Sequence, residues 1–581
     1  DIPEIALKKS FENDNTETTV SWTMLLPEKQ NGVSVSLLSG DKEAISVKTL
    51  NGGIYAGNEM LKSDYNANFW YNFCLKINRT TKTYDVLINY KTVKSAIPYS
   101  GDVIDGISFK KTASGIGELL IDDVKVYKSF EKYADYPGTP QKADSADVNA
   151  GMVMYPMWRE GIHFGWDTIS PYADERKPLL GYYTEGQREV SDWQNKWMAE
   201  HGIDYAIYPF VRPASDTAEP VKMPVRGEDL NCGYMNSEYS DYLNFAILLS
   251  AFSTENYHGA EDFIENVIPY ISEYYFSDPR YMKINNKLPV FCYSFVQMSR
   301  TLGGAAETAK VINALEEAAK KLGYDGIIFG ADAASAAGHA LTEQINSSSV
   351  YIWQYSMQSG NVNYLKARTD EEYRYSSRYI ASVPMGYDDT PWRASYSRML
   401  LPNQAEDFCG YVKQHSGFSS SAEKMVVFTC WNEYGEGHYF APSTKGGFGY
   451  LNAIRNTFTA NGKKTDEDTP SDTALARMGA FYPNGRGALK TLPDKQFTDA
   501  DITRRNVLYR YDFDADNADN WNKHDCTAEI NNGCMEGTAY SSNVYLECFD
   551  LDTGVDISNV EAVKLRIYEK GKHNINYYYV T

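Results

Sequence analysis

Two glutamates, Glu433 and Glu436, lie three residues apart in the segment Trp431-Asn-Glu-Tyr-Gly-Glu-Gly-His-Tyr439. The glycines at 435 and 437 permit backbone shapes that other residues resist, so the segment can turn tightly and direct both carboxylates into one cleft. Such a pair suits the cleavage of a sugar linkage, where one carboxyl group must arrive protonated and the other ionised. Their proximity separates their pKa values, because like charges resist joint ionisation. The alternative is two surface acids on a loop. The apolar run and the aromatic neighbours favour the catalytic interpretation.

Other polar and aromatic residues follow short apolar segments along the same part of the chain. Carboxylates and amides hydrogen-bond to hydroxyl groups, and aromatic rings stack on the apolar faces of sugars. We therefore predict substrate contacts for Tyr155, His163, Trp166, Asp167, Tyr208, Arg212, Glu255, Tyr293, Asp332, Gln354, Asp388, Asp389, Trp392, Trp431, Asn432, His438 and Tyr439. For each of them the alternative is a structural role, since polar residues at strand ends also brace loops.

Several other chemistries find no support in the sequence. His163 and Asp167 could ligate a metal ion, but two residues do not make a site, so we expect no metal. No Ser-His-Asp arrangement stands out, no GxGxxG follows an expected strand and no phosphate-binding glycine loop appears, so we expect no cofactor. The net charge of -21 disfavours nucleic acid and anionic membranes as partners. No apolar run of about 18 residues is present, so we expect no membrane span.

The elements that must position these side chains alternate between strands and helices. Apolar segments that predict strands occupy residues 151–158, 203–211, 243–252, 288–295, 326–331, 349–355, 380–387 and 425–431. Helical patterns cover 189–201 and 305–322, which end at Gly202 and Gly323, and a last helix is expected near 450–459. Eight strands that alternate with helices predict a closed (β/α)8 TIM barrel over residues 150–462. Its site should lie at the carboxyl ends of the strands.

The regions on either side of the barrel have β patterning. Residues 1–132 contain short alternating segments at 20–26, 33–38, 44–50, 69–77, 83–90, 106–110 and 117–127, which predict a β-sandwich or jelly roll. A linker is expected at 133–149 and a connecting segment at 463–505. Residues 506–581 predict a second sandwich-like domain, too short to be complete, so we expect the natural chain to continue. The protein is therefore expected to be multidomain.

Three further features leave alternatives open. The acidic run at 511–521 could hold Ca²⁺, with a solvated loop as the other interpretation. The 46 tyrosines suit sugar stacking or simply a β-rich chain. The 8 cysteines contain no CxxC and do not decide the compartment, although one pair among the three late ones is conceivable. The chain begins with Asp1, which we interpret as a processed form or an expressed fragment from which any signal peptide has been removed.

The strand-eight segment and four weaker motifs resemble a known family. Residues 431–442, followed by Gly449-Tyr-Leu451, resemble the closing motif of the glycoside hydrolase family 99-like group, which includes proteins labelled WbsX-like glycosyltransferases. The weaker matches are Leu180-Gly-Tyr-Tyr183, Ala199-Glu-His-Gly-Ile-Asp204, Asp278-Pro-Arg-Tyr281 with Lys287-Leu-Pro-Val290, and Gly386-Tyr-Asp-Asp-Thr390. The resemblance implies a (β/α)8 barrel and retaining, endo-acting cleavage of α-mannosides. Residues 69–89 and 121–127 resemble the concanavalin-like (laminin-G-like) sandwiches appended to bacterial carbohydrate enzymes.

The same resemblance implies separate roles for the two glutamates. Glu433 would assist the sugar 2-hydroxyl as it attacks the anomeric carbon, and Glu436 would act first as general acid and then as general base. The intermediate would be a 1,2-anhydro sugar. This chain has Tyr434 and Gly435 where family 99 commonly has Trp and His, and it is closer there to the WbsX-like group.

Three hypotheses follow from the sequence. The first is an extracellular, retaining and endo-acting glycoside hydrolase of a polysaccharide or complex glycan, and both glutamates favour it. The second is a non-catalytic glycan-binding protein with a decayed barrel. The third is a WbsX-like glycosyltransferase, which the missing nucleotide-binding motif disfavours. The sugar, its linkage and the oligomeric state are left open.

Overall fold

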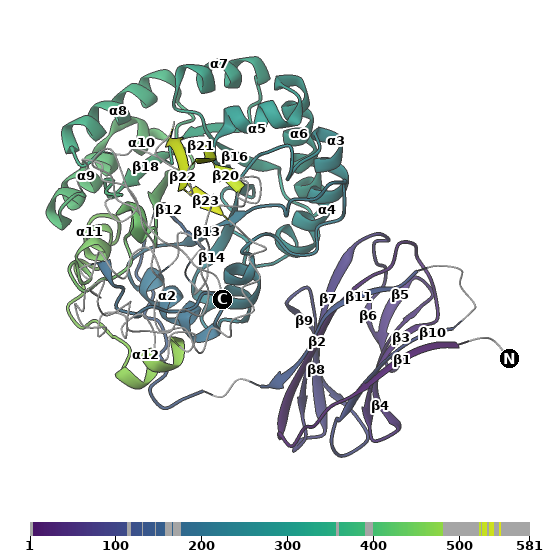
Figure 1. Ribbon diagram of the computed structural model, residues 1–581. Helices are drawn as coiled ribbons and strands as arrows, with labels where there is room; N and C mark the ends of the chain where they lie inside the picture. The colour runs from purple at the N-terminus through teal and green to yellow at the C-terminus, as the bar shows by residue number, and fades with distance from the viewer. Residues whose placement is uncertain are drawn as a thin grey trace.

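The computed structural model describes residues 4–112, 118–129, 132–145, 147–156, 158, 166, 176–355, 359–389, 399–479, 522–524, 526–531, 534–539 and 545–547. Two large bodies occupy most of the described chain: an antiparallel β-sandwich and a parallel barrel surrounded by helices (Figure 1). Within the described ranges, no helix has both the length and the apolar character needed to cross a lipid bilayer.

The barrel contains all eight of the predicted strands. They are β12 (Asn149–Val153), β13 (Tyr205–Phe210), β14 (Asn244–Leu249), β15 (Leu288–Cys292), β16 (Ile327–Asp332), β17 (Val350–Trp353), β18 (Ala381–Pro384) and β19 (Met425–Thr429). All neighbouring pairs are parallel, in the order β17-β16-β15-β14-β13-β12-β19-β18. A parallel bridge between Ile352 and Tyr379 joins the two outer strands. The predicted parallel barrel is therefore confirmed.

Large and small side chains alternate in the barrel interior. The rings of Tyr205 and Phe291 stack with centroids 6.5 Å apart, and Phe291 meets Trp353 edge-on at 5.2 Å. Gly151 lies against Tyr205, where an added Cβ would stand 2.5 Å from the ring, and Gly330 lies against Phe291, where the distance would be 2.7 Å. The two glycines thus provide the space that these rings need in a densely packed core.

Helices follow most strands and cover the outside of the barrel (Figure 1). The main helices are α2 (Arg188–Glu200), α5 (Phe295–Leu302), α6 (Ala305–Lys321), α7 (Ala336–Ile345), α8 (Val362–Tyr375), α9 (Pro402–Gln414) and α11 (Gly449–Phe458). Between β14 and β15 the layer consists of α3 (Ala260–Asp262), η5 (Phe263–Val267), α4 (Ile268–Tyr270) and η6 (Ile271–Phe276). The predicted helix ends are confirmed at Gly202 and Gly323, whose φ angles of +81° and +92° favour glycine.

The N-terminal sandwich has one six-stranded and one five-stranded antiparallel sheet. The first runs β1 (Glu4–Ser10), β10 (Gly106–Thr112), β3 (Val33–Ser39), β4 (Lys42–Leu50), β5 (Gly53–Ala56), β6 (Glu59–Lys62). The second runs β11 (Leu120–Lys128), β2 (Glu17–Leu25), β7 (Trp70–Asn78), β8 (Thr83–Ile88), β9 (Lys91–Pro98). The prediction missed β1, β5, β6 and β9. In β9 only Ile97 is buried, so this strand has no alternating apolar pattern to detect.

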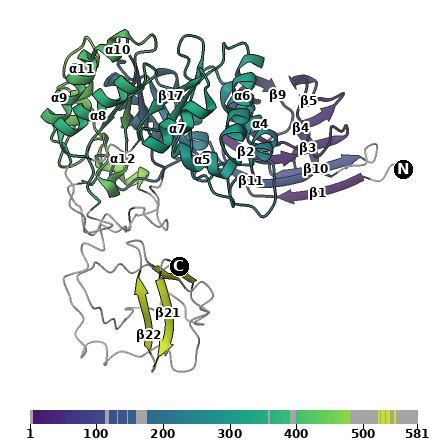
Figure 2. The ribbon, with the colours of Figure 1, turned by 90° about the horizontal axis from the view of Figure 1, so that it is seen from above.

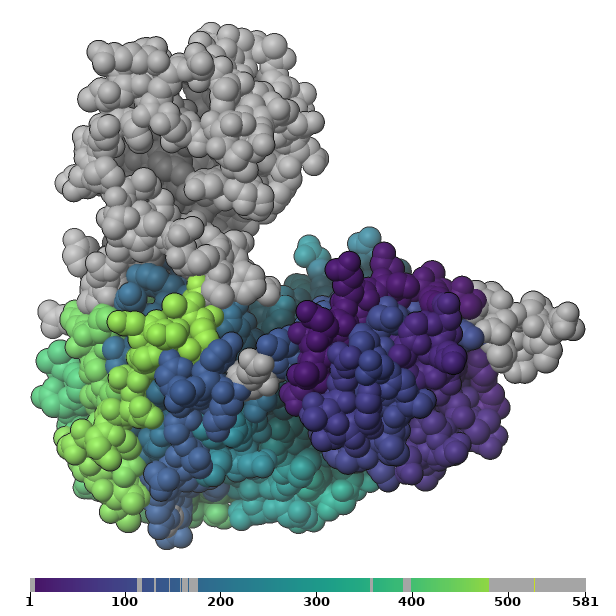
Figure 3. All heavy atoms as spheres, turned by 90° about the horizontal axis from the view of Figure 1, so that it is seen from below, coloured from purple at the N-terminus to yellow at the C-terminus, as the bar shows by residue number. Residues whose placement is uncertain are grey.

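The sandwich packs on the outer layer of the barrel through η6. The Tyr274 hydroxyl donates to the backbone oxygen of Trp70 at 2.7 Å, and Lys62 pairs with Glu273 at 2.8 Å. The ring of Phe69 lies 5.7 Å from that of Tyr274. In the space-filling view the purple and blue sandwich rests directly on the teal part of the barrel (Figure 3). These contacts fix the sandwich to the barrel as a brace.

The C-terminal region differs from its prediction. Its described elements are β20 (Asn522–His524), β21 (Cys526–Asn531), β22 (Cys534–Ala539) and β23 (Tyr545–Glu547), of which β21 and β22 are labelled in Figure 2. They form two separate two-stranded antiparallel pairs, β20 with β23 and β21 with β22. Among the described residues there is thus no clear C-terminal sandwich, because two pairs do not make two facing sheets. The acidic run at 511–521 lies outside the described residues.

Candidate active site

The strand-eight segment forms a closed turn directly after β19. The Glu433 N–H donates to the His438 carbonyl at 2.9 Å, and the His438 N–H donates back to the Glu433 carbonyl at 3.1 Å. A short 3-10 helix, η7 (Tyr434–Glu436), occupies the turn. Gly437 closes it with φ +67°, and an added Cβ there would stand 3.0 Å from the Asp388 nitrogen. This turn places both glutamates at the carboxyl end of the barrel. The tight turn predicted from the two glycines is therefore present.

The two carboxyl groups lie close together in different surroundings. One carboxylate oxygen of each glutamate and a ring nitrogen of His438 all lie within 4.8 Å of one another. Glu433 is 4% exposed, whereas Glu436 is only partly buried. Burial, and then the charge of Glu436, raises the pKa of Glu433 well above its ordinary value. Burial therefore favours the protonated form of Glu433.

A tyrosine from the end of β17 meets the buried glutamate. The Tyr355 hydroxyl donates to Oε2 of Glu433 at 2.7 Å, which lowers the pKa of Glu433 against the effect of burial. Asp332, at the end of β16, accepts the N–H groups of Tyr355 at 3.3 Å and Ser294 at 3.4 Å. Burial raises the pKa of Asp332 to about 6. Asp332 therefore holds the backbone of the residue that orients Glu433.

Two predicted contact residues share the environment of the pair. Tyr155 is half-buried, and the charges of both glutamates add to burial in raising its pKa. His438 is fully buried, and burial lowers its pKa to about 4, so its imidazole is neutral at pH 7. Within the described part of the chain, Glu433, Glu436 and His438 are the three residues whose geometry could hold a metal ion.

An arginine outside the predicted set joins three loops above the barrel. Arg176 Nη1 donates to the carbonyls of Asp388 at 2.6 Å and Tyr434 at 2.9 Å, and Nη2 pairs with the Asp388 carboxylate at 2.8 Å. The Asp388 N–H in turn donates to the Glu436 carbonyl at 2.7 Å. Arg176 is 4% exposed. The predicted contact residue Asp388 thus braces the turn that carries both glutamates.

Asn432 links this turn to the first barrel loop. Its Oδ1 accepts the Tyr155 N–H at 2.7 Å, and its Nδ2 donates to Oε1 of Glu185 at 2.9 Å. Asn432 is fully buried. The sequence predicts Asn432 as a substrate contact, and the structure gives its amide protein partners on both sides.

Aromatic side chains surround the turn at different depths. Trp166, Trp431 and Tyr439 are almost fully buried, and the Trp166 ring lies 5.6 Å from that of Tyr434. Tyr293 differs from them, because it is 39% exposed and meets Tyr355 edge-on at 5.1 Å. Of these predicted contact residues, Tyr293 offers the most accessible ring for stacking on a sugar.

Other predicted contact residues lie elsewhere or have protein partners. Arg212 is 2% exposed, pairs with Asp262 and donates to the Glu219 carbonyl at 2.7 Å. Glu255 is exposed in the loop after β14. Asp389 is 2% exposed and accepts the Tyr387 hydroxyl at 3.1 Å. These surroundings favour a loop-bracing role for Arg212 and Asp389.

Of the remaining predicted contact residues, two have protein neighbours and three lie outside the described residues. Tyr208 is 2% exposed on β13, and its ring lies 5.7 Å from that of Tyr234. Gln354 is partly buried beside Tyr355, and its N–H donates to the Ser382 hydroxyl at 3.1 Å. His163, Asp167 and Trp392 lie outside the described residues.

Sequence reasoning missed Tyr355, Arg176 and Glu185. Tyr355 stands one residue beyond the predicted Gln354, so the strand-end signal was present and a wider window would have included it. Arg176 and Glu185 lie in the long segment between β12 and α2. No periodicity in that segment indicates which of its residues turn toward β19.

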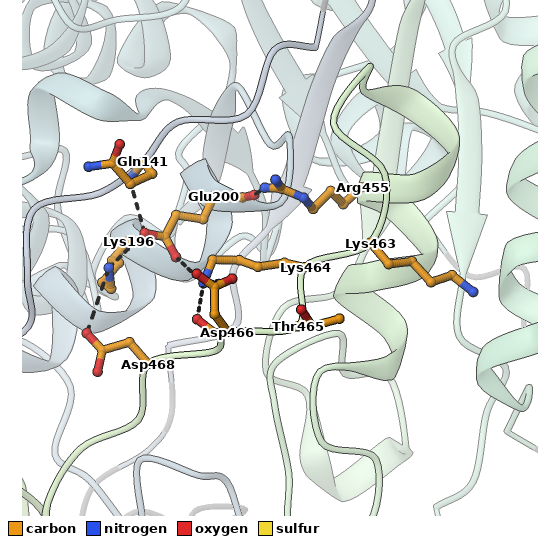
Figure 4. A pocket seen from close by; sticks show the side chains of 9 residues that line it. All are labelled: Gln141, Lys196, Glu200, Arg455, Lys463, Lys464, Thr465, Asp466 and Asp468. Carbon is orange, nitrogen blue, oxygen red and sulfur yellow. Dashed lines mark hydrogen bonds and ion pairs between the residues drawn. The ribbon is translucent and has the colours of Figure 1, made fainter.

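A separate cavity lies at the other end of the barrel. It has a volume of about 360 Å³ and is lined by Gln141, Lys196, Glu200, Arg455, Lys463, Lys464, Thr465, Asp466 and Asp468. Four residues separate Glu200, the last residue of α2, from the start of β13, so this cavity faces the amino ends of the strands. Lys196 and Glu200 pair there at 2.7 Å (Figure 4). Its paired charges attach the segment after α11 to the barrel, away from the two glutamates.

Comparisons with known proteins give one sequence family and several similar structures. The family model described as glycosyltransferase WbsX matches residues 340–454. A protein described as "Uncharacterized protein WxcX" from Xanthomonas campestris pv. campestris (strain B100) is 31% identical over 105 residues. That match covers 17% of this chain and 15% of the relative, so the chain spans only a small part of the relative's length.

Two solved structures illustrate the structural similarity. The GH99 endo-alpha-mannosidase from Bacteroides thetaiotaomicron is 15% identical, with a TM-score of 0.40, over 59% of this chain and 99% of that one. The galectin LEC-6 from Caenorhabditis elegans is 9% identical, with a TM-score of 0.18, over 22% of this chain and 93% of that one. The family match at 340–454 contains β17, β18, β19 and the turn with Glu433 and Glu436. The expected resemblance to the WbsX-like group is therefore confirmed for the segment that carries both glutamates.

Proposed function

We propose that this protein is a glycoside hydrolase that cleaves a polysaccharide or complex glycan with Glu433 and Glu436. The observation that carries this proposal is the pair itself, whose carboxylate oxygens lie within 4.8 Å at the carboxyl end of a (β/α)8 barrel. One carboxyl group is buried and the other is partly exposed. Glycosidic cleavage needs such a difference, because one group donates a proton while the other stays ionised.

The proton moves between the two glutamates when the substrate binds. Burial favours the proton on Glu433 in the free protein. A sugar hydroxyl that donates to Glu433 stabilises the ionised form of this carboxylate, since a hydrogen bond to the charged form lowers a pKa. The proton then belongs to Glu436, the more accessible group, which can meet the glycosidic oxygen.

Cleavage proceeds in two balanced steps. The substrate 2-hydroxyl attacks the anomeric carbon and gives its proton to Glu433, while Glu436 protonates the leaving oxygen and the glycosidic bond breaks. Water then attacks the anomeric carbon of the 1,2-anhydro sugar and gives its proton to Glu436. The bond between this carbon and O2 breaks, and Glu433 returns the proton to O2. Two inversions at one carbon give net retention. The short separation of the carboxylates supports retention, because inverting enzymes hold them roughly 6.5–9.5 Å apart to admit a water.

We further infer an endo-acting, extracellular enzyme. A sandwich fixed beside the barrel suits a protein that works on a large glycan, and the WxcX match to Xanthomonas campestris is consistent with a bacterial source. Fractionation of the producing cells tests the location, and the length of the first products tests the endo mode.

A glycan panel with product analysis tests the hydrolase directly. We expect wild type to release new oligosaccharide ends. Glu433→Gln and Glu436→Gln should each lose at least about a hundredfold in kcat, since positioned acid–base groups contribute about 10²–10⁴. Glu372→Gln, which changes a glutamate of α8 that is as buried as Glu433, is the control for that variant and should keep kcat. Equal activity of both site variants would refute this residue assignment, and binding without cleavage by wild type would favour a glycan-binding protein.

A sugar transferase is the second candidate, favoured by the description of the WbsX family model. The two functions differ in the donor substrate, because a transferase needs an activated sugar such as a nucleotide sugar. Calorimetric titration with UDP-, GDP- and dTDP-sugars distinguishes them. Micromolar binding of a nucleotide sugar that Glu433→Gln abolishes would favour the transferase. Cleavage of a glycan together with no binding of any nucleotide sugar would favour the hydrolase.

A further inference from the structure

A second pair of carboxyl groups, those of Glu185 and Asp229, lies beside the site. Glu185 precedes α2, and its Oε1 accepts Nδ2 of Asn432 at 2.9 Å. Its Oε2 accepts the Trp158 N–H at 3.0 Å. Both carboxylate oxygens of Glu185 therefore receive a donor, one from the turn after β19 and one from the segment after β12. Glu185 joins these two neighbouring barrel loops.

Asn432 transmits this connection to the proposed catalytic group. Its Nδ2 also donates to the Tyr183 hydroxyl at 3.1 Å, and its Oδ1 accepts the Tyr155 N–H at 2.7 Å. All three contacts are buried or partly buried. The amide therefore has one orientation that satisfies its partners: the oxygen toward Tyr155 and the nitrogen toward Glu185. Asn432 is directly followed by Glu433, so this orientation also fixes the start of the turn.

The second member of the pair, Asp229, lies at the start of η2 (Asp229–Gly233) and is 1% exposed. In the described structure, neither of its carboxylate oxygens has a hydrogen-bond donor. An ionised carboxylate buried in this way is costly, so the group is expected to be neutral. Burial, followed by the charge of Glu228, raises the pKa of Asp229 to about 7, and the charge of Asp229 adds to burial in raising the pKa of Glu185.

Several charged or titratable groups share this environment. Those that interact with Glu185 or Asp229 are Arg226, Glu228, Tyr183, Tyr208 and Tyr434. Arg226 is the cation among them, and it favours the ionised form of Glu185. Glu228 favours a proton on Asp229. Both carboxylate oxygens of Glu185 accept a donor, whereas neither oxygen of Asp229 does in the described structure, so this hydrogen bonding favours a proton on Asp229 over one on Glu185.

We propose that Glu185, supported by a neutral Asp229, is a positioning residue of the reaction: it orients Asn432 and thereby aligns the backbone of Tyr155 and Glu433. This role rests on the proposed function. Glu185 acts through Asn432 and contacts neither of the two catalytic glutamates in the described hydrogen bonds. The buried carboxyl pair is thus part of the site although it stands outside the chemistry.

The first test replaces Glu185 by Gln, which has nearly the same shape but a single acceptor oxygen. One of the two donors, Trp158 N–H or Asn432 Nδ2, then faces an NH₂ group. We expect kcat to fall about tenfold to a hundredfold with KM nearly unchanged, because a buried donor is left without an acceptor. Glu185→Asp, which keeps both acceptors on a shorter side chain, should recover part of the loss. Glu372→Gln controls for destabilisation alone. An unchanged kcat in Glu185→Gln overturns the proposal.

The second test measures stability against pH and needs no substrate. In the folded protein Asp229 keeps its proton up to about pH 7, whereas the unfolded chain releases it near 3.8. The folded state therefore binds more protons between these values, and the contribution of this group to stability falls as pH rises from about 4 to 7. Asp229→Asn removes this decline, so the variant should gain melting temperature relative to wild type over that interval. Parallel curves overturn the neutral Asp229.

Hydrogen–deuterium exchange separates this proposal from the proposed function. If wild type cleaves no glycan, the proposed hydrolase function is refuted. The connection through Asn432 still predicts that the Tyr155 and Glu433 amides exchange faster in Glu185→Gln than in wild type. Equal exchange at both amides overturns the positioning role, whatever the reaction is.

Discussion

The Tyr355 hydroxyl donates a 2.7 Å hydrogen bond to Oε2 of Glu433, the buried member of the carboxylate pair. The two residues are 78 positions apart in the chain and meet only because β17 and β19 end at the same side of the barrel. This hydrogen bond opposes the effect of burial and of Glu436 on the pKa of Glu433. It therefore favours the ionised form of Glu433.

Tyr355→Phe should shift the pH dependence of cleavage. Loss of the donor raises the pKa of Glu433 further, so the alkaline limb of kcat/KM, where the carboxyl pair loses its proton, should move to higher pH. A hydrogen bond to a charged group contributes about 1.5–3 kcal/mol, which corresponds to about 1–2 pH units. Tyr351→Phe is the control. Tyr351 lies on β17, and its hydroxyl also donates to a glutamate, Glu423, at 2.9 Å. An unmoved limb would show that another group controls it.

Arg176→Met should reduce both stability and turnover. The change removes a buried cation from Asp388 and leaves the Tyr434 carbonyl without this donor. Breaking a buried ion pair costs about 3–5 kcal/mol, which chemical denaturation would measure. We expect kcat to fall at least about tenfold, because the turn that carries Glu436 loses a support. Arg280→Met breaks the pair with Asp278 at the amino end of the barrel and should lower stability alone. Equal kcat losses in the two variants would contradict the specific role of Arg176.

Phe69→Ala should weaken the attachment of the sandwich to the barrel. The ring of Phe69 lies 5.7 Å from Tyr274 and 6.4 Å from Tyr270. Calorimetry should detect a lower melting temperature of the barrel, since a buried Phe→Ala change costs about 3–5 kcal/mol. Turnover of a short oligosaccharide should stay unchanged. Phe109→Ala, on β10 of the opposite sheet, is the matched control and should leave the barrel transition in place. Identical effects of the two changes would argue against a brace.

Removal of metal ions should not affect cleavage. Glu433, Glu436 and His438 have the geometry to hold a cation, yet the proposed chemistry needs the carboxylates free to exchange protons. We expect kcat to change by less than about twofold after dialysis against EDTA and after addition of Ca²⁺, Mg²⁺ or Zn²⁺. If EDTA lowers kcat and one of these ions restores it, the acid–base mechanism is wrong and a metal-assisted reaction takes its place.

The sequence by itself determined the barrel and the glutamate pair. Parallel strands are buried on both faces, so each of the eight appears as a local apolar run, and helices that end at glycines are equally local signals. The turn of Glu433 and Glu436 was predictable for the same reason, because Gly437 and the preceding strand are its neighbours in sequence.

Only the tertiary structure decided which other residues reach the pair. Tyr355, Arg176 and Glu185 arrive from separate loops, and the direction of a loop side chain depends on packing rather than on periodicity. Arg212, at a strand end like Tyr355, instead turns to Asp262 and is buried in an ion pair. Strand ends fix the edge where a side chain starts, and contacts between distant segments fix where it points.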